Sequence, residues 1–446
     1  MKQTYIILLH VFMIAVAGSI HAQESWTLNQ CIEYALNNNL DHRLYELDEQ
    51  MAKVDATQSK LNLLPSLSIS SSAGTSYGRS IDPNTNGVIN TEFFNNSNSL
   101  NSSIGLFNGF TQQNRIAYSK FRLQASRYQR VNFQDDLAFG ISMAYYDVVY
   151  FEGVVEIVRE QLKLSEFNLK KTETQIATGL KAKTDLAEMQ ATYEREKLSL
   201  IQSENNLEEA KLNLGRQMNL PAGQLIRIVS DAGEPVDTQN LRLSSDSLFA
   251  SFVQISPYVK MSEANLDAAG KNIAMVRGQY FPSVYLRASV NTGYSDTYRD
   301  QDGKTFSFSD QIDNNMSQYV GASVTIPIFG RNQVRSEVRK AKLYRDDALA
   351  EVEKSKQAVY YELINNTREL QALFAEYVQT KKQVEADELA YQVARRKYDE
   401  GLIDVIELLA VKSRLSEAQG HLLLTGLQWK IKDKVLEFYK GIRFWE

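Results

Sequence analysis

ATGLKAKTDL at residues 177–186 and DEGLIDVIEL at residues 399–408 are the two stretches that decide the fold of this chain. Each contains a Gly-Leu pair, with an acidic residue six positions after the glycine. A second pair of matching motifs lies upstream of them, Leu64-Pro65-Ser66 and Phe281-Pro282-Ser283. Because the same motifs recur in the same order, the chain is predicted to be internally duplicated and to fold as two similar halves.

Two long segments without proline predict unusually long helices. Residues 331–400 contain neither proline nor glycine, and residues 110–178 contain no proline. Proline breaks helices, so each segment can form one helix on the order of 100 Å long, at about 1.5 Å per residue. From Val334 to Tyr398 the apolar residues recur with a mean spacing of about 3.6, which gives one narrow apolar stripe. Such helices are expected to stand side by side in a wall that has one face toward water.

The duplication also sets the expected organisation of the chain. The first structural repeat is predicted at 23–218 and the second at 247–446, each with a shorter helix after its long one, at 182–217 and 404–440. Residues 219–246, which contain two prolines and two glycines, are expected to be the non-helical connection between the repeats.

Local signals place further helices at the start of each repeat. Thr27 and Gln30 form a capping box, which predicts a helix from this point. Cys31 then falls on that helix and is expected to be a small buried residue. Pro257 is expected to open a helix in the second repeat, because proline is favourable at the first helical position.

Each repeat also contains two segments in which apolar and polar residues alternate. These predict strands at about 65–78 and 99–107 in the first repeat, and at about 282–294 and 318–329 in the second. A soluble hairpin packed on a helix would show the same alternation. The length of the strands and the aromatic residues near their ends favour membrane-spanning strands instead.

Long polar segments at 79–98 and 295–316 are expected to be loops that join the strands of each pair, as in outer-membrane proteins. Four strands leave two open edges, which lipid does not tolerate. The predicted fold is therefore mainly α with a four-stranded β contribution: a long α-helical barrel or tunnel plus a transmembrane β-barrel completed by oligomerisation. These arguments leave the number of copies open.

The first 22 residues have the pattern of a secretory signal peptide. Lys2 supplies a positive charge, residues 5–17 are mostly apolar, and Ala22 offers a small residue for cleavage before Gln23. No later apolar run reaches the length of a membrane helix. The mature chain is thus expected to be exported and to lack a helical anchor.

Charge and composition argue against several functions. The chain has a formal net charge of −5, and removal of Lys2 makes it more negative, which disfavours a nucleic-acid partner. Cys31 is the single cysteine, so no internal disulfide can form. His42 and His421 have no neighbouring acidic or cysteine cluster, so neither a metal site nor a cofactor is expected. No arrangement typical of a catalytic site is visible, so an enzyme is not expected.

The order of these motifs resembles that of the TolC-type outer-membrane efflux factor family, over essentially the whole mature chain. The motifs are Trp26-Thr27-Leu28, both Pro-Ser strand entries, Leu106-Phe107-Asn108-Gly109, Ile328-Phe329-Gly330 and both Gly-Leu pairs. No single motif is as specific as a set of metal ligands. Their order and duplication together carry the resemblance.

The resemblance implies a homotrimer whose copies each give four strands to a twelve-stranded barrel, with the helices continuing as a periplasmic tunnel. Such a protein lies in the cell outer membrane, in contact with its lipid. It acts as the passive exit duct of a tripartite export system, with a periplasmic adaptor protein and an inner-membrane RND or ABC transporter as partners. Two alternatives stay open: a barrel-anchored coiled-coil stalk or adhesin without a transport role, and a duct for type I protein secretion.

The resemblance also assigns roles to residues at the two helical turns. The adaptor-docking tips are Gly179, Leu180, Gly401 and Leu402. The residues of the periplasmic aperture are Asp185, Glu407, Thr184 and Tyr398. In this family the acidic residues form a ring at the closed constriction, and Thr184 and Tyr398 match positions that bond across it. Ile403 and Ala410 depart from the family pattern, which has an arginine and a second acidic residue there.

Overall fold

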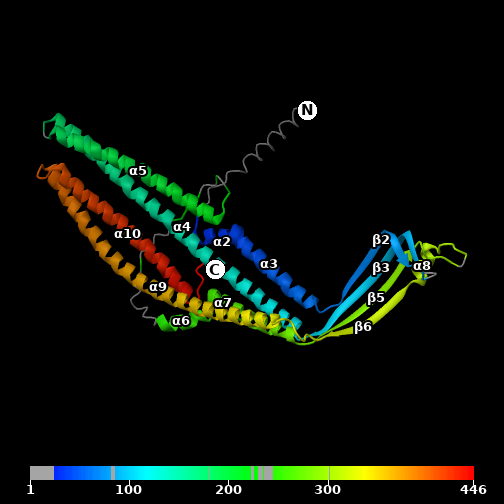
Figure 1. Cartoon of the computed structure of the whole chain (residues 1–446). Helices are drawn as coiled ribbons and strands as arrows, with labels where there is room; N and C mark the ends of the chain where they lie inside the picture. Colours follow the sequence, from blue (N-terminus) through cyan, green and yellow to red (C-terminus); the bar gives the residue numbers. More distant parts are fainter. Residues whose placement is uncertain are drawn as a thin grey trace, which may run out of the picture. The chain divides into compact units, whose positions relative to one another are not determined.

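Two long helices dominate the computed structural model, α4 (Thr111–Ala177) and α9 (Gln333–Asp399), each of 67 residues (Figure 1). The structure describes residues 25–81, 86–179, 181–221, 223, 226–229, 235, 245–300 and 302–445. The predicted signal peptide and Leu180 lie outside these residues. The chain is mainly helical with a four-stranded antiparallel sheet, as the sequence predicts.

Residue contacts divide the chain into two compact units. One unit is Met1–Glu46, Gln129–Pro257 and Lys356–Glu446, and the other is Leu47–Tyr128 and Tyr258–Ser355. Both long helices contribute residues to both units.

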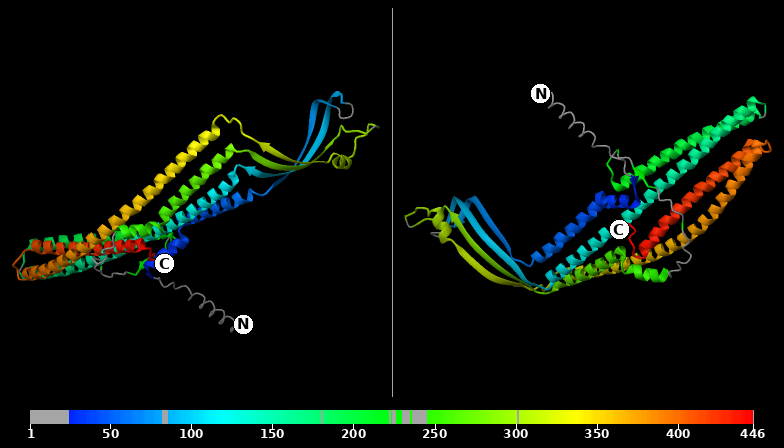
Figure 2. Two further views of the ribbon diagram at one scale, coloured as in Figure 1. Left: turned by 90° about the horizontal axis from the view of Figure 1, so that it is seen from below. Right: turned by 180° about the vertical axis from the view of Figure 1, so that it is seen from behind.

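The first unit contains two helical hairpins. Helix α4 turns back into α5 (Lys183–Met218), and α9 turns back into α10 (Val405–Tyr439); in each hairpin the two helices run side by side (Figure 2). Short helices α2 (Leu28–Asn38) and α6 (Ser245–Val253) pack at the base of these hairpins. A two-stranded parallel pairing joins β1 (Ser25–Trp26) to β4 (Arg227–Ile228).

Helix α2 begins where the capping box predicts. The Thr27 side chain accepts from the backbone N–H of Gln30, and the Gln30 side chain accepts from that of Thr27. Cys31, Ile32 and Ala35 are fully buried against α4 and α5. Burial raises the pKa of the Cys31 thiol to about 12, so this cysteine is a core residue without thiolate character at neutral pH.

The second unit contains the sheet, most of the helices α3 (Leu40–Leu61) and α7 (Pro257–Arg277), and the 3₁₀ turn η2 (Gly278–Tyr280). Pro257 opens α7, as predicted from its place in the repeat. The sheet order is β2 (Ser66–Ile81), β3 (Val88–Asn108), β5 (Ser283–Ser295) and β6 (Ser317–Thr325), all antiparallel. A bulge interrupts the β3–β5 register between Gly105 and Phe107.

The segment 79–98, expected to be a polar loop, is mostly strand. The register between β2 and β3 continues without a shift from Ser66↔Ser103 to Ile81↔Val88. Asparagine and serine occupy both faces there, so no alternation was visible. Strands can pair without such alternation, because the hydrogen bonds between them join backbone groups whatever the polarity of the side chains.

Two further expectations for the sheet differ from the structure. The segment 295–316 is not wholly irregular, because it contains α8 (Phe308–Asn314), which Ser307 caps through the Asp310 N–H. Strand β6 ends at Thr325, before the predicted end at residue 329. Pro327 follows, and proline has no N–H to continue a ladder.

The register places the side chains of the sheet on two unlike faces. On one face lie the apolar residues Leu67, Ile69, Leu100, Ile104, Val290, Leu286, Val320 and Val324, and on the other mainly serine and asparagine. Ile69 is 81% exposed and Val320 is 74% exposed. In water, such a large exposed apolar face would be unfavourable. This face of the sheet is therefore suited to an apolar environment.

Candidate functional site: the tips of the two helical hairpins

Each hairpin turns at a glycine in the left-handed region. Gly179 has φ +76° and Gly401 has φ +75°, and the amide of each donates to a carbonyl three residues back, at 2.9 and 3.1 Å. A Cβ added at either position would meet nothing within 4 Å. The glycines are therefore required by backbone conformation and not by crowding.

Both turns are exposed. Leu402 is 68% exposed, directly after Gly401, and its amide closes the turn on the Lys397 carbonyl at 2.8 Å. Its counterpart in the first hairpin, Leu180, lies outside the described residues. Ile403 instead turns inward and packs against the core cluster of Met189, Tyr391, Ala394, Tyr398, Val405, Leu408 and Leu415.

The start of α10 is capped more strongly than the start of α5. Asp404 accepts from the backbone N–H of Glu407 at 2.8 Å, whereas Ala182 at the start of α5 makes no side-chain cap. The Asp-x-x-Glu spacing was available in the sequence as a capping signal. Glu407 is thus held through its backbone while its carboxylate stays exposed.

The structure gives Tyr398 partners other than Thr184. Its side chain is buried, and its hydroxyl lies 3.4 Å from the Thr172 hydroxyl, while Thr184 is exposed. Burial raises the pKa of Tyr398, the Thr172 hydrogen bond lowers it, and the Asp185 carboxylate raises it again.

Two lysines of the first hairpin hold the second hairpin near its tip. The Lys181 ammonium lies 3.9 Å from the centroid of the Tyr398 ring and 3.5 Å from the Tyr398 carbonyl oxygen. The Lys171 ammonium lies 2.6 Å from an Asp399 carboxylate oxygen, with both side chains about one-third exposed. Asp185 and Glu407 open different helices, and no hydrogen bond joins them within the described chain.

A buried lysine lies deeper in the same unit, at a core position of α10. Lys412 falls between Leu408 and Leu415 on the buried stripe of the helix, and its side chain is 4% exposed. Its ammonium donates to the Gln161 carbonyl at 2.9 Å, to the Ser165 hydroxyl at 2.7 Å and to Glu196 Oε1 at 2.7 Å. Burial lowers the pKa of Lys412, although the Glu196 carboxylate opposes that shift. Lys412 thereby ties α10 of the second repeat to α4 and α5 of the first.

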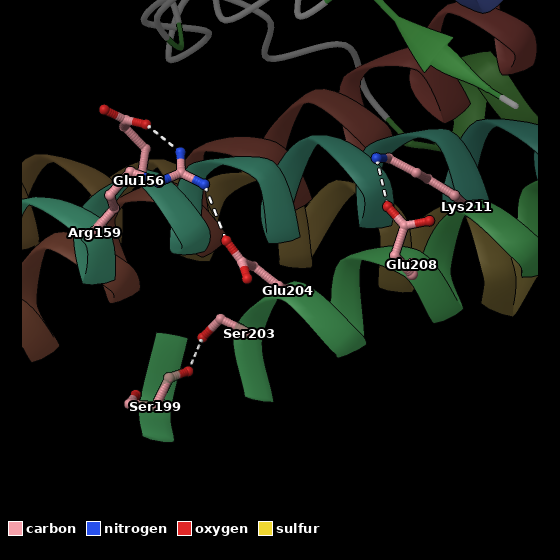
Figure 3. Close-up of polar contacts among 7 residues, drawn as sticks. All are labelled: Glu156, Arg159, Ser199, Ser203, Glu204, Glu208 and Lys211. Atoms are coloured by element: carbon pink, nitrogen blue, oxygen red, sulfur yellow. Dashed lines mark hydrogen bonds and ion pairs between the residues drawn. The ribbon is translucent and has the colours of Figure 1, made fainter. Parts of the chain in front are cut away.

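Helices α4 and α5 also carry ordinary surface ion pairs, of which the pair of Arg159 and Glu204 joins the two helices. Figure 3 shows Arg159 between Glu156 and Glu204, at 3.2 Å from each, with side chains 41–62% exposed. Lys211 and Glu208, both on α5, form a pair at 2.9 Å within that helix. Exposed pairs of this kind contribute about 0–1 kcal/mol each.

Neither a metal-binding cluster nor a membrane-spanning helix is found among the described residues. They contain no group of three or more His, Cys, Asp or Glu that could hold a metal ion. No helix in the described part of the chain combines the length and the apolar character that crossing a membrane requires.

Comparison with known proteins gives one consistent family. A family model described as "Outer membrane efflux protein" matches residues 31–219 and 251–441, one segment in each repeat. The chain is similar to the pyoverdine export outer membrane protein OpmQ of Pseudomonas aeruginosa, with 21% identity over 67% of this chain and 59% of OpmQ. It is also similar to the outer membrane protein TolC of Escherichia coli, with 23% identity over 94% of this chain and 84% of TolC.

A solved structure of CusC, described in terms of transmembrane channel formation, superposes with a TM-score of 0.78 at 19% identity. The match covers 94% of this chain and 95% of CusC. At this identity the likeness shows the fold. The match to OpmQ spans less than two thirds of that protein's length, whereas the match to TolC spans most of it.

Proposed function

We propose, from the premise that this chain belongs to the outer membrane efflux protein family and is one of its outer-membrane channels, that three copies form the exit duct of a tripartite export system. Each copy would give its four strands to one closed sheet, and the helices would form the periplasmic tunnel. A periplasmic adaptor and an inner-membrane RND or ABC transporter would supply the substrate and the energy. The family consists of channels and not of enzymes, so the duct itself is passive.

The observation that carries this proposal is the sheet with two unlike faces and two outer strands. Strands β2 and β6 each pair on one side within the chain. Outer strands of this length offer unpaired backbone groups that lipid does not tolerate. Leu67 and Val324 on the apolar face are 72% and 61% exposed. Closure with strands of other copies would satisfy both edges, turn the apolar face to lipid and leave the serine-rich face toward a water-filled pore.

The domain boundaries follow as part of the same proposal. Residues 1–22 would be removed as a signal peptide. Residues 23–218 and 247–446 would be the two structural repeats, and residues 219–246 the connection between them.

The hairpin tips are proposed as the adaptor-docking surface. Gly179 and Gly401 shape two exposed turns, and Leu402 offers an exposed apolar side chain on one of them. We assign the same role to Leu180 from its place in the repeat. An exposed leucine on a turn shaped by glycine is suited to enter a groove between partner helices.

The periplasmic aperture is proposed to involve Asp185, Glu407, Thr184 and Tyr398. In a trimer the two carboxylates would recur three times around one axis and attract cations at the constriction. Tyr398, held by Thr172 and Lys181, would keep the two hairpins together near this ring. Ile403 packs inward where an arginine would offer a cross-helix bond, which supports a gate with few such bonds.

Single-channel conductance of the purified protein in a planar lipid bilayer tests the proposal. Wild-type protein is expected to show small openings with a preference for cations. Absence of conductance from protein shown to be inserted would overturn the duct and favour a stalk or adhesin.

A further inference from the structure

The serine-rich face of the sheet carries one charged side chain among its paired and described residues, that of Arg287. Arg287 lies in the middle of β5 and is exposed. Its register partners on this face are Ser103 on β3 and Gly321 on β6, and Ser103 pairs in turn with Ser66 on β2. The charge therefore sits within a row of small neutral residues that crosses all four strands.

The rows on either side of Arg287 are also neutral. On one side, the next row on the same face is Ser68, Asn101, Ser289 and Tyr319, and on the other side it is Gly105, Tyr285 and Ser323. No carboxylate pairs with Arg287 within the described chain. A guanidinium without a counter-charge is free to attract anions from solution.

The surface around Arg287 is hollowed and lined with hydroxyl groups. A depression of about 260 Å³ is lined by Arg287 together with Ser66, Ser68, Asn101, Ser103, Ser289 and Tyr319. The Tyr319 hydroxyl lies over Gly321, in the space that a side chain at that position would fill. The hydroxyls of Ser66 and Ser103 lie 2.9 Å apart. Guanidinium and hydroxyl donors that converge on one hollow are suited to bind an oxyanion.

We propose that Arg287 is a selectivity residue of the pore, where it binds carboxylate- or phosphate-bearing solutes and favours anions over cations. The inference rests on the proposed function, because closure of the sheet by three copies is what brings three such charges into one lumen. Rings of arginine or lysine make pores selective for anions and phosphates. In water, a fixed unit charge changes the local concentration of a monovalent ion about 8 Å away from it roughly twofold. Three charges, partly screened by salt, are expected to change the permeability ratio of chloride to potassium roughly fivefold.

The test measures reversal potentials in a tenfold gradient of potassium chloride, with inorganic phosphate as an added probe. All proteins carry the Asp185→Ala and Glu407→Ala changes, so that the proposed acidic aperture does not dominate the selectivity. Arg287→Gln removes the charge at similar length, and Arg287→Lys keeps the charge without the bidentate fork. Arg79→Gln is the matched control, because Arg79 is on β2, two positions after Tyr77 and on the opposite face in the register.

The expected results separate the three variants. Arg287→Gln lowers the chloride-to-potassium permeability ratio roughly fivefold and abolishes transient block by phosphate. Arg287→Lys keeps the permeability ratio but weakens the phosphate block, and Arg79→Gln changes neither. Equal selectivity and block in Arg287→Gln and the parent overturns the inference while leaving the duct intact. No conductance from inserted parent protein instead contradicts the proposed function itself.

Discussion

The Lys412 ammonium lies 2.7 Å from Glu196 Oε1, in a contact that joins residues 216 positions apart in the chain. Both side chains are largely removed from solvent, with 4% and 20% of their surfaces exposed. The pair connects α10 to α5, so it joins the two repeats within one packed core. Buried polar pairs of this kind set which helices pack together and in which register, at a cost in stability.

Loss of one partner of this pair should destabilise the protein strongly. Lys412→Met or Glu196→Gln leaves the other group buried without its partner, which costs about 3–5 kcal/mol. The Lys412→Met/Glu196→Met double variant should recover most of that loss, because neither charge remains in the core. Thermal unfolding of the protein in detergent, followed by circular dichroism, measures the difference.

The exposed pair of Arg159 and Glu204 serves as the control for this comparison. It joins α4 to α5 at 3.2 Å, and its side chains are 41% and 49% exposed. Its single and double variants should each change stability by less than about 1 kcal/mol. Equal effects at the buried and the exposed pair would contradict the role assigned to Lys412.

Valine in place of the two turn glycines should strain the turns and impair export. At φ near +75° a β-branched residue is strained, at a cost of about 1–2 kcal/mol for each turn. Gly179→Val with Gly401→Val is expected to impair export while the protein still reaches the membrane, because the strain is confined to the exposed tips. Drug tolerance of a strain that depends on this duct provides the measurement.

Gly270→Ala in α7 is the matched control for the glycine variants, since Gly270 has ordinary helical φ and nothing within 4 Å of an added Cβ. Alanine there should stabilise the helix by about 0.5–1 kcal/mol without loss of export. Full drug tolerance in the double valine variant, with normal amounts in the membrane, would count against the docking role.

The acidic residues near the tips should set ion preference. Asp185→Ala with Glu407→Ala removes the two carboxylates proposed for the aperture, so cation preference in single-channel recordings should fall and openings should grow larger. Glu188→Ala, on the first turns of the same helix α5, is the control and should leave both quantities near wild type. Unchanged cation preference and opening size in the double variant would contradict the aperture assignment but leave the proposed duct intact.

Asp433 should make stability depend on pH in a defined direction. Burial, reinforced by the charge of Glu437, raises the pKa of the Asp433 carboxyl above its ordinary value of 3.8. The folded state then binds the proton more tightly, so this contribution is present below the ordinary pKa and is lost as pH rises through the raised one. Asp433→Asn should therefore make the melting temperature depend less on pH between the ordinary and the raised pKa. It should also raise the melting temperature near pH 7. A pH profile unchanged by the substitution would show that Asp433 does not titrate as described.

The secondary structure was largely predictable because its signals are local. The 3.6-residue stripe in α9, the capping box at Thr27 and the proline that opens α7 are each read within one or two turns of helix. The predicted bounds of a strand were wrong where the sequence offers no such local signal. Strand β3 starts ten or so residues before its predicted start, because asparagine and serine on both faces show no alternation.

Part of the candidate site was also predictable. The two Gly-Leu turns and the acidic residue after each follow from the repeat, and the structure gives both glycines the left-handed conformation that such turns require. The partners of Tyr398 were not predictable, since Thr172 and Lys181 reach it from another helical hairpin. Lys412 could have been noticed as a charged residue at a core spacing, but not its three acceptors.

The sequence by itself determined the duplication, the long helices, the two-faced strands and the glycine turns, because each depends on neighbours a few residues away. Only the tertiary structure decided that Lys412 contacts Glu196, that Thr172 contacts Tyr398 and that Arg287 pairs with Ser103 and Gly321. These relationships join segments far apart in the chain, and their geometry follows from how helices pack and strands pair. No pattern within one element contains that information.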